Sequence, residues 1–123
     1  VRHTLTYVNA GQNPPCRLGG GDAFDRLAAT GPPLGLFAEA AYTARTLELA
    51  CGDLVLCFSD GATEGRSASD EEFGEERLID IARQSRNEKP EEIVRRATFA
   101  VEQHSAASPR QDDTTLVVLK RRD

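Results

Sequence analysis

Three acidic residues stand where strands are expected to end or begin. The segment GDLVLCFSDGATEGR (residues 52–66) is apolar before it presents Asp60 and a glycine. Asp112 and Asp113 directly precede a second strand-like run, TTLVVL (residues 114–119). If these strands are antiparallel neighbours, the end of one lies beside the start of the other, about 4.8 Å away. The sequence therefore predicts that Asp60 and Asp112 meet at one rim of a sheet.

Two close carboxylates favour binding of a divalent cation. They repel each other and raise each other's pKa unless a cation neutralises them. Because no His or Cys accompanies Asp60 or Asp112, these oxygen ligands suit Mg²⁺ or Mn²⁺ better than zinc. The structural alternative is that Asp-Gly is an ordinary turn and that Asp before a strand is an ordinary loop residue. Neither motif is specific by itself, so both interpretations stay open.

The elements that must position these acids follow from hydrophobic periodicity. Strands are expected at residues 4–8, 16–18, 43–49, 54–59 and 114–119, and helices at residues 74–86 and from Pro90 to about His104. The continuous apolar run at 54–59 indicates a strand that is covered on both faces. Strands, then helices, then a strand predict the α+β class, with a mostly antiparallel sheet and helices packed outside.

Local signals refine the two helices. Ser69 and Glu72 have capping-box spacing ahead of the first. Pro90 is a good first-turn residue for the second, and His104 continues its apolar stripe as a packed edge residue. The solvent-exposed face of the second helix is expected to carry two i,i+4 ion pairs, Glu91–Arg95 and Glu92–Arg96.

The glycine run at residues 19–22 has two interpretations. A phosphate-binding loop would need a Lys-Ser/Thr pair and a helix directly after it, and neither is present. A hairpin turn closing the strand at 16–18 fits better. Together with the strand at 4–8, this pattern favours a β-meander.

Composition excludes several classes of protein. The chain has 123 residues, 39% hydrophobic content and a net charge of -5, which predicts a globular piece of one domain without a nucleic-acid footprint. No apolar run approaches the length of a membrane span. Three cysteines, with Cys57 expected as a buried thiol, favour a reducing, cytoplasmic compartment over a disulfide framework. Because the chain starts at Val1 and contains no Met, we expect a piece of a longer protein.

Four ordered motifs resemble one family. They are LTYVNAGQNPP, GPPLGLF, GDLVLCFSDGATEGRS followed by FGEERL, and QDDTTLVVL. In this order they resemble the bacterial PPM-type, metal-dependent serine/threonine phosphatases, in the branch of stage II sporulation protein E and the sigma-factor regulatory phosphatases. The resemblance implies an antiparallel β-sandwich flanked by helices, a four-layer αββα fold. It also implies that residues 1–123 are the C-terminal portion of a single phosphatase domain.

The resemblance also implies roles for individual residues. Asp60 and Asp112 match metal-binding acids, and Asp113 matches a neighbour with a supporting or structural role. Gly61 would let the turn pass close to the site. Two further loop residues would lie near the metal rim: Asn9 and Gly11. Where many relatives carry His, this chain has Gln12, so a titrating role at that position is not expected here.

The implied activity is hydrolysis of phosphoserine or phosphothreonine on a regulatory protein, such as an anti-sigma-factor antagonist. Two Mn²⁺ or Mg²⁺ ions would supply the water that attacks phosphorus. A sensor or receiver domain is expected upstream. The family's earlier block, a Glu and a bridging Asp beside Gly-His-Gly, has no match here. We therefore expect weak metal affinity and little activity from this piece alone, and self-association through an uncovered sheet edge.

Other interpretations remain at this level. The chain is either a fragment of an intact phosphatase or a natural truncation. A phosphatase-like module that binds a partner without catalysis is the main alternative function. A generic acidic α+β domain with turn aspartates is the third. Retained acids at Asp60 and Asp112 favour the enzyme, because a pure scaffold needs no paired acids on a rim.

Overall fold

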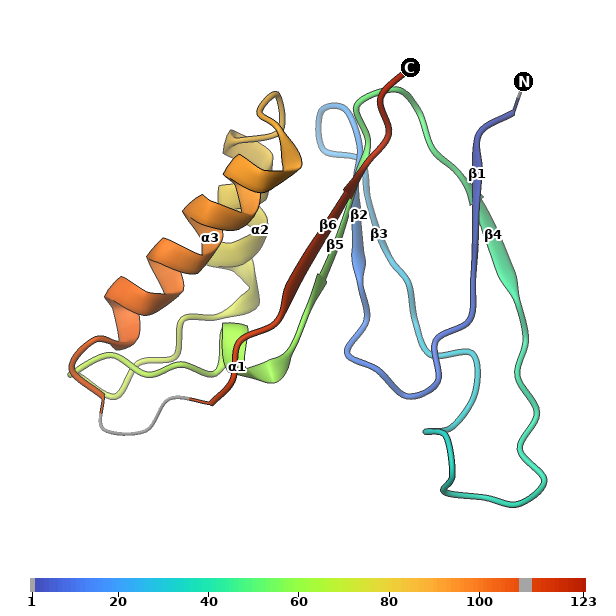
Figure 1. Ribbon diagram of the computed structural model, residues 1–123, viewed down its shortest axis with the longest axis horizontal. Coiled ribbons are helices and arrows are strands. Elements are labelled where there is room, and N and C mark those ends of the chain that lie inside the picture. Colours follow the sequence, from blue (N-terminus) through green and yellow to red (C-terminus); the bar gives the residue numbers. More distant parts are fainter. Residues whose placement is uncertain (1, 109–111) are drawn as a thin grey trace.

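The computed structural model describes residues 2–108 and 112–123 (Figure 1). Its elements are, in chain order, β1 (Thr4–Tyr7), β2 (Cys16–Leu18), β3 (Phe24–Arg26), β4 (Arg45–Glu48), β5 (Leu54–Phe58), α1 (Asp60–Thr63), α2 (Glu75–Gln84), α3 (Pro90–Ser105) and β6 (Leu116–Lys120). Val1, with which the chain starts, lies outside the described residues, and so does Gln111, the first residue of the closing motif QDDTTLVVL.

The strands form two antiparallel sheets. The larger has the order β3-β2-β5-β6, and the smaller pairs β1 with β4. Helices α2 and α3 cover one face of the larger sheet, and the β1–β4 pair lies on its other side (Figure 1). The predicted α+β class with helices outside the sheet is confirmed. The chain supplies one helical layer and parts of two sheets, which is consistent with a portion of a four-layer sandwich.

β5 is the buried centre of this arrangement. Leu54, Leu56 and Phe58 are at most 4% exposed and belong to the main core cluster. Val55, which points to the opposite face, is 2% exposed, so the run is covered on both sides as predicted. Cys57 is only half-buried, and the prediction of a buried thiol there is wrong. The rest of the core cluster includes Cys16, Leu18, Ala62, Phe73, Leu78, Ala82, Ile93, Ala97 and Val101.

β6 forms one edge of the larger sheet and leaves apolar side chains uncovered. Val117 and Leu119 pair with Cys57 and Val55 in the antiparallel register and are 46% and 48% exposed. Cys57 is half-buried beside Val117, whereas Val55 is buried although its partner Leu119 is equally exposed. An unpaired edge with apolar side chains is a surface on which other chains associate. Self-association through this edge stays a prediction.

The order of strand pairing differs from the predicted β-meander. β1 pairs with β4 rather than with β2, which lies between β3 and β5. The connection at residues 9–15 contains Pro14 and Pro15, which cannot donate backbone hydrogen bonds. Asn9 folds this connection on itself by accepting a hydrogen bond from the Gln12 N–H at 2.7 Å. It is therefore a structured loop, and not a tight hairpin between consecutive strands.

The glycine run makes the predicted hairpin turn, but it joins a strand that was not predicted. The Gly19 N–H donates to the Ala23 carbonyl at 2.8 Å, and β2 returns as β3. β3 comprises Phe24, Asp25 and Arg26. Such a short, charged segment has no apolar alternation by which periodicity could reveal it.

The long helices match the predicted segments, with a different start for α2. This helix begins after Gly74, and no side chain caps it. The predicted capping box is wrong, because Ser69 hydrogen-bonds Ser67 and Glu72 accepts a hydrogen bond from Arg66. Both residues are therefore engaged within the loop that precedes the helix. Within the described part of the chain, no helix has the length and apolar character to cross a membrane.

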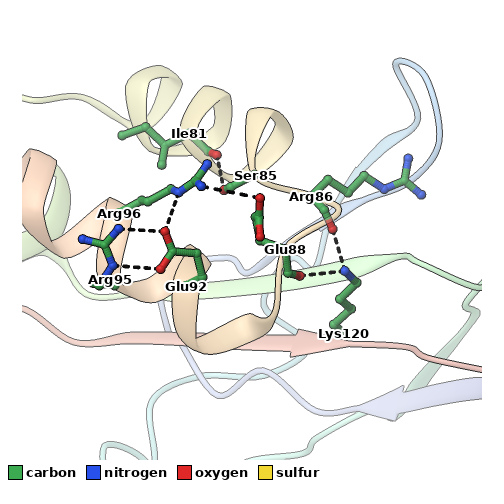
Figure 2. A network of polar contacts seen from close by, with 8 residues as sticks. All are labelled: Ile81, Ser85, Arg86, Glu88, Glu92, Arg95, Arg96 and Lys120. Carbon is green, nitrogen blue, oxygen red and sulfur yellow. Dashed lines mark hydrogen bonds and ion pairs between the residues drawn. The ribbon is translucent and has the colours of Figure 1, made fainter.

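Glu92 organises the first turns of α3 (Figure 2). It accepts hydrogen bonds from Arg96 at 2.8 Å, which confirms one predicted pair. Arg95 also binds Glu92, at 2.7 Å, so the predicted pairing of Arg95 with Glu91 is wrong. The hydrogen bonds from Arg95 and Arg96 lower the pKa of Glu92 to about 2. These pairs are exposed, and exposed pairs contribute little to stability.

Lys120 attaches the connection between α2 and α3 to the sheet (Figure 2). Its ammonium group donates to the carbonyl oxygens of Arg86 at 2.7 Å and Glu88 at 2.8 Å. The hydroxyl of Ser85 donates to the Ile81 carbonyl at 2.6 Å, where α2 ends. The last residue of β6 therefore holds the turn between the two covering helices.

A buried carboxylate holds the start of β5. Asp53 is 1% exposed. Its Oδ2 accepts hydrogen bonds from Arg17 Nη1 and from the Ala50 N–H, each at 2.9 Å. Its Oδ1 lies 3.6 Å from Arg86 Nη2. One buried charge thus joins β2, the turn before β5 and the segment after α2.

Replacing this carboxylate tests its contribution to stability. Asp53→Asn keeps the shape but removes the charge that Arg17 and Arg86 face, and we expect the free energy of unfolding to fall by about 2–3 kcal/mol. The measurement is urea unfolding. Asp22→Asn is the matched control, because Asp22 is fully exposed and 3.8 Å from Arg83; we expect a change below about 0.5 kcal/mol there. Equal losses for the two variants would contradict the prediction.

Candidate metal centre at the end of the β5–β6 pair

The end of β5 places Asp60 at the rim of the larger sheet. The strand stops at Phe58, and Asp60 is the first residue of α1. The predicted turn is therefore a single turn of helix, closed by the Glu64 N–H, which donates to the Asp60 carbonyl at 2.8 Å. The Asp60 side chain is exposed. Its carboxylate stands in solvent at the place where the buried strand ends.

The antiparallel register of β6 brings the second pair of acids to the same rim. Phe58 pairs with Leu116, so the residues before β6 run alongside those after β5. Ser59 links the two segments. Its hydroxyl accepts a hydrogen bond from the Thr115 N–H at 2.9 Å and donates to the Asp113 carbonyl at 3.3 Å. The convergence of the two acidic segments, predicted from strand pairing, is what the structure shows.

Gly61 permits the closest approach between the two segments. A Cβ atom at Gly61 would stand 2.2 Å from the Asp113 carbonyl oxygen and 3.2 Å from that of Asp112. A real side chain cannot occupy that space without moving the backbone. The Thr114 hydroxyl also donates to the Gly61 carbonyl at 3.3 Å. Gly61 is thus required by close backbone packing, and its role beside a metal stays a prediction.

The acidic side chains open onto separate hollows. Asp60 lines a hollow of about 480 Å³ whose other residues are Gly11, Gln12, Asn13, Pro14 and Ser59. Asp112 lines a narrow hollow of about 40 Å³ with Gly61 and Thr114, and a wider one of about 550 Å³ with Glu64. Among the described residues, no group of three or more His, Cys, Asp or Glu could hold a metal ion. The rim therefore offers two carboxylates from adjacent segments, and not a closed ligand shell.

Asn9 shapes the loop that faces Asp60 and does not act as a free ligand. It is 5% exposed. Its amide donates to the carbonyls of Leu27 at 2.9 Å and Gln12 at 3.1 Å, and its Oδ1 accepts from the Gln12 N–H. These bonds hold the side of the hollow that Gly11 and Gln12 form. Gly11 thus lines the hollow of Asp60, Asn9 holds the loop that carries Gly11, and their place beside a metal stays a prediction.

Ser59 is the residue whose role the sequence did not reveal. It stood inside a recognised motif, but its two hydrogen bonds reach residues more than fifty positions away. Only the strand register could have identified them. Asp113 is exposed, and its carbonyl is what contacts Ser59. Thr63 donates to the Asp60 carbonyl at 3.2 Å, which stabilises the short helix.

Solved structures of phosphatase domains share this fold. The SiaA-PP2C domain of Pseudomonas aeruginosa matches with a TM-score of 0.79 at 18% identity, over 97% of this chain and 47% of that one. The phosphatase domain of SpoIIE from Bacillus subtilis matches with a TM-score of 0.60 at 23% identity, over 95% and 50%. The RsbU and RsbW domains of Rv1364c from Mycobacterium tuberculosis match with a TM-score of 0.62 at 22% identity, over 98% and 33%. The fold is that of PP2C-type phosphatase domains.

The sequence comparisons define the family. The chain is 29% identical over 119 residues to Protein IcfG of Synechocystis sp., which covers 95% of this chain and 18% of that protein. The family model described as stage II sporulation protein E (SpoIIE) matches residues 1–122. The chain belongs to this family, and the resemblance found in its motifs is confirmed. It spans about half the length of the SiaA and SpoIIE phosphatase domains that it matches.

Gly61→Ala tests whether close packing of the two acidic segments matters for metal binding. The added methyl must displace the backbone at Asp113, so we expect a loss of about 1–3 kcal/mol in stability. We also expect Mn²⁺ affinity of the complete domain to fall at least about tenfold, measured by calorimetric titration. Gly65→Ala is the control, because its Cβ would meet Ser105 at an ordinary 3.5 Å. Unchanged Mn²⁺ binding by a folded Gly61→Ala variant would contradict the prediction.

Proposed function

We propose that this chain is part of a metal-dependent phosphoprotein phosphatase that hydrolyses phosphoserine or phosphothreonine on a regulatory protein. The observation that carries the proposal is the meeting of the Asp60 and Asp112 segments at one sheet end in a member of the SpoIIE family. The SpoIIE phosphatase domain of Bacillus subtilis, which shares this fold, has also been solved after presoaking with Mn. We infer an anti-sigma-factor antagonist as the substrate and the cytoplasm as the compartment, with a sensor or receiver domain in the same parent protein.

The donor set at the rim fits Mn²⁺ or Mg²⁺. Asp60 and Asp112 present exposed carboxylates, and Mg²⁺ is commonly held by one or two carboxylates together with waters and phosphate oxygens. In this proposal Asp60 and Asp112 are the metal ligands of the chain. The close packing of Gly61 on the Asp113 carbonyl fixes the backbone segments that carry these two ligands. Two bound ions would supply a water of lowered pKa and neutralise charge on the phosphoryl group. Asn9 and Gly11 would hold the facing loop in place.

The thiols of the chain do not favour a covalent cysteine mechanism. Burial raises the pKa of Cys16 to about 12, with a further contribution from its hydrogen bond to Glu75. Burial also raises the pKa of Cys57. Both are therefore protonated near neutral pH, whereas the thiolate is the nucleophile in such enzymes. Cys51 lies in the turn before β5, at the opposite end of that strand from Asp60. These properties of the thiols agree with water, and not a cysteine, as the nucleophile.

The histidines do not supply an alternative base. His104 packs edge-on against Phe73, with ring centroids 5.4 Å apart, and its Nε2 lies 2.8 Å from the Glu71 carbonyl oxygen. It is the packed edge residue that its position in the helix predicted. His3 lines a hollow with Arg2 and Glu48 near the start of β1. Neither imidazole lines the hollow that contains Asp60.

One observation favours a second candidate function. No third acid joins Asp60 and Asp112 in the described part of the chain, so a phosphatase-like module that binds a partner without catalysis is the alternative. The two functions differ in turnover by the complete domain. A binding module would retain its partner without hydrolysing it, and its affinity would not depend on Mn²⁺.

The metal-ligand assignment is tested by Asp60→Asn and Asp112→Asn in the complete domain. We expect each to reduce Mn²⁺-dependent hydrolysis of p-nitrophenyl phosphate by at least about a hundredfold and to weaken Mn²⁺ binding in calorimetry, because an amide loses the charge that holds the cation. Asp22→Asn, an exposed change in the β2–β3 turn, is the control and should leave both unchanged. Wild-type Mn²⁺ affinity in Asp60→Asn would favour the interpretation of Asp60 as an ordinary turn residue.

The chain alone should bind metal weakly and turn over little substrate. Its described residues offer two rim acids and no larger ligand group, so we expect activity at least about a thousandfold below that of the complete domain. The measurement is Mn²⁺-dependent p-nitrophenyl phosphate hydrolysis by both proteins at equal concentration. Full turnover by residues 1–123 would overturn the expectation.

A further inference from the structure

Residues 31–37 form an exposed apolar loop that the proposed hydrolysis does not use. Leu34, Leu36 and Phe37 are 78%, 62% and 63% exposed. These three residues lie within four positions of the sequence, and exposed apolar patches mark interaction sites more often than isolated exposed residues do. Within residues 31–44 the single charged residue is Glu39. Contacts made by this loop must therefore be largely apolar.

The loop contains a hydrogen-bonded turn. The Leu36 N–H donates to the Pro33 carbonyl at 3.3 Å, and Gly35 between them has φ of 80°. This is the pattern of a type II turn, in which glycine takes the position that needs positive φ. Pro32 and Pro33 restrict the backbone further. A preorganised loop loses little conformational entropy when a partner binds.

The loop adjoins the hollow that contains Asp60. The Thr30 N–H donates to the Asn9 carbonyl at 2.8 Å, immediately before the loop. Gly11 packs so closely on the loop that a Cβ there would stand 2.5 Å from Pro33 Cγ, and the same Gly11 lines the Asp60 hollow. Figure 1 shows the connection between β3 and β4 at the same end of the molecule as α1. Gly11 thus contacts the loop at Pro33 and lines the hollow that contains Asp60.

We propose that residues 31–37 dock the phosphoprotein whose phosphate ester enters the Asp60 hollow, with Leu34, Leu36 and Phe37 contacting an apolar surface beside the phosphorylated residue. This rests on the proposed function. A protein interface covers about 800 Å² on each partner, a patch roughly 30 Å across. A folded protein whose ester reaches Asp60 therefore has to cover the adjoining loop. The loop selects a protein over a small ester, because a small ester fills only the hollow.

The test compares two variants of the complete domain. The first combines Leu36→Ala with Phe37→Ala; the second, Phe99→Ala, removes an aromatic ring of similar exposure, 57%, from α3. Three substrates are used: a phosphorylated anti-sigma-factor antagonist, a short phosphoserine peptide from it, and p-nitrophenyl phosphate. We expect the loop variant to raise KM for the phosphoprotein at least about tenfold with little change in kcat, because buried aromatic contacts dominate interfaces. Peptide and small-ester kinetics should match those of Phe99→Ala.

The outcomes separate this proposal from the proposed function. An unchanged KM for the phosphoprotein overturns docking. A loop variant that unfolds in circular dichroism also overturns it, because the loop would then be covered by the domain itself or by a second copy. If the wild-type complete domain hydrolyses none of the three substrates, the proposed function fails. Docking is then judged by fluorescence anisotropy of the labelled phosphoprotein, in which the loop variant must raise Kd at least about tenfold.

Discussion

The pairing of β5 with β6 is the constraint on which the rest of the site depends. Its register sets Phe58 against Leu116, and every residue beyond those two is placed by continuing that ladder. Ser59 then bonds both Asp113 and Thr115, and the missing side chain of Gly61 leaves room for the carbonyl of Asp113. Residues more than fifty positions apart are thereby held in contact by backbone geometry. The acids need no direct attraction to each other, which two like charges could not supply.

The two ends of β5 carry aspartates with opposite surroundings. Asp53 is buried and faces Arg17 and Arg86, so its charge is neutralised inside the fold. Asp60 is exposed, and no ion pair joins it to a cation within the residues that the structure describes. A buried unpaired carboxylate would be costly, whereas an exposed one at a rim costs little until a ligand arrives. The first aspartate therefore serves stability, and the second is available for chemistry.

Periodicity predicted the elements better than it predicted their partners. The buried run of β5, the stripe of α3 and the strand before the C-terminus follow from local patterns, so they could be read from the sequence. The pairing of β1 with β4 depends on contacts between distant segments, and β3 is too short and too charged to show a period. The capping box failed because Glu72 binds Arg66. For the site, antiparallel pairing was enough to foresee that the segments carrying Asp60 and Asp112 converge, but the bridging role of Ser59 required the register itself.

β6 adjoins both an incompletely covered apolar surface and one of the proposed metal ligands. Its Val117 and Leu119 are half exposed, and Asp112, which precedes it, lines different hollows from the one described for Asp60. The matched SiaA and SpoIIE phosphatase domains are about twice as long as this chain. A strand added beside β6 would lie about 4.8 Å away and bring its own end close to Asp112, whereas Val117 and Leu119 project from a face of the sheet and are covered only by a layer packed on that face, about 10 Å away. We therefore expect folding stability and metal affinity to rise together when the domain is complete, because the added residues would supply apolar cover for this face and a further strand end at the rim.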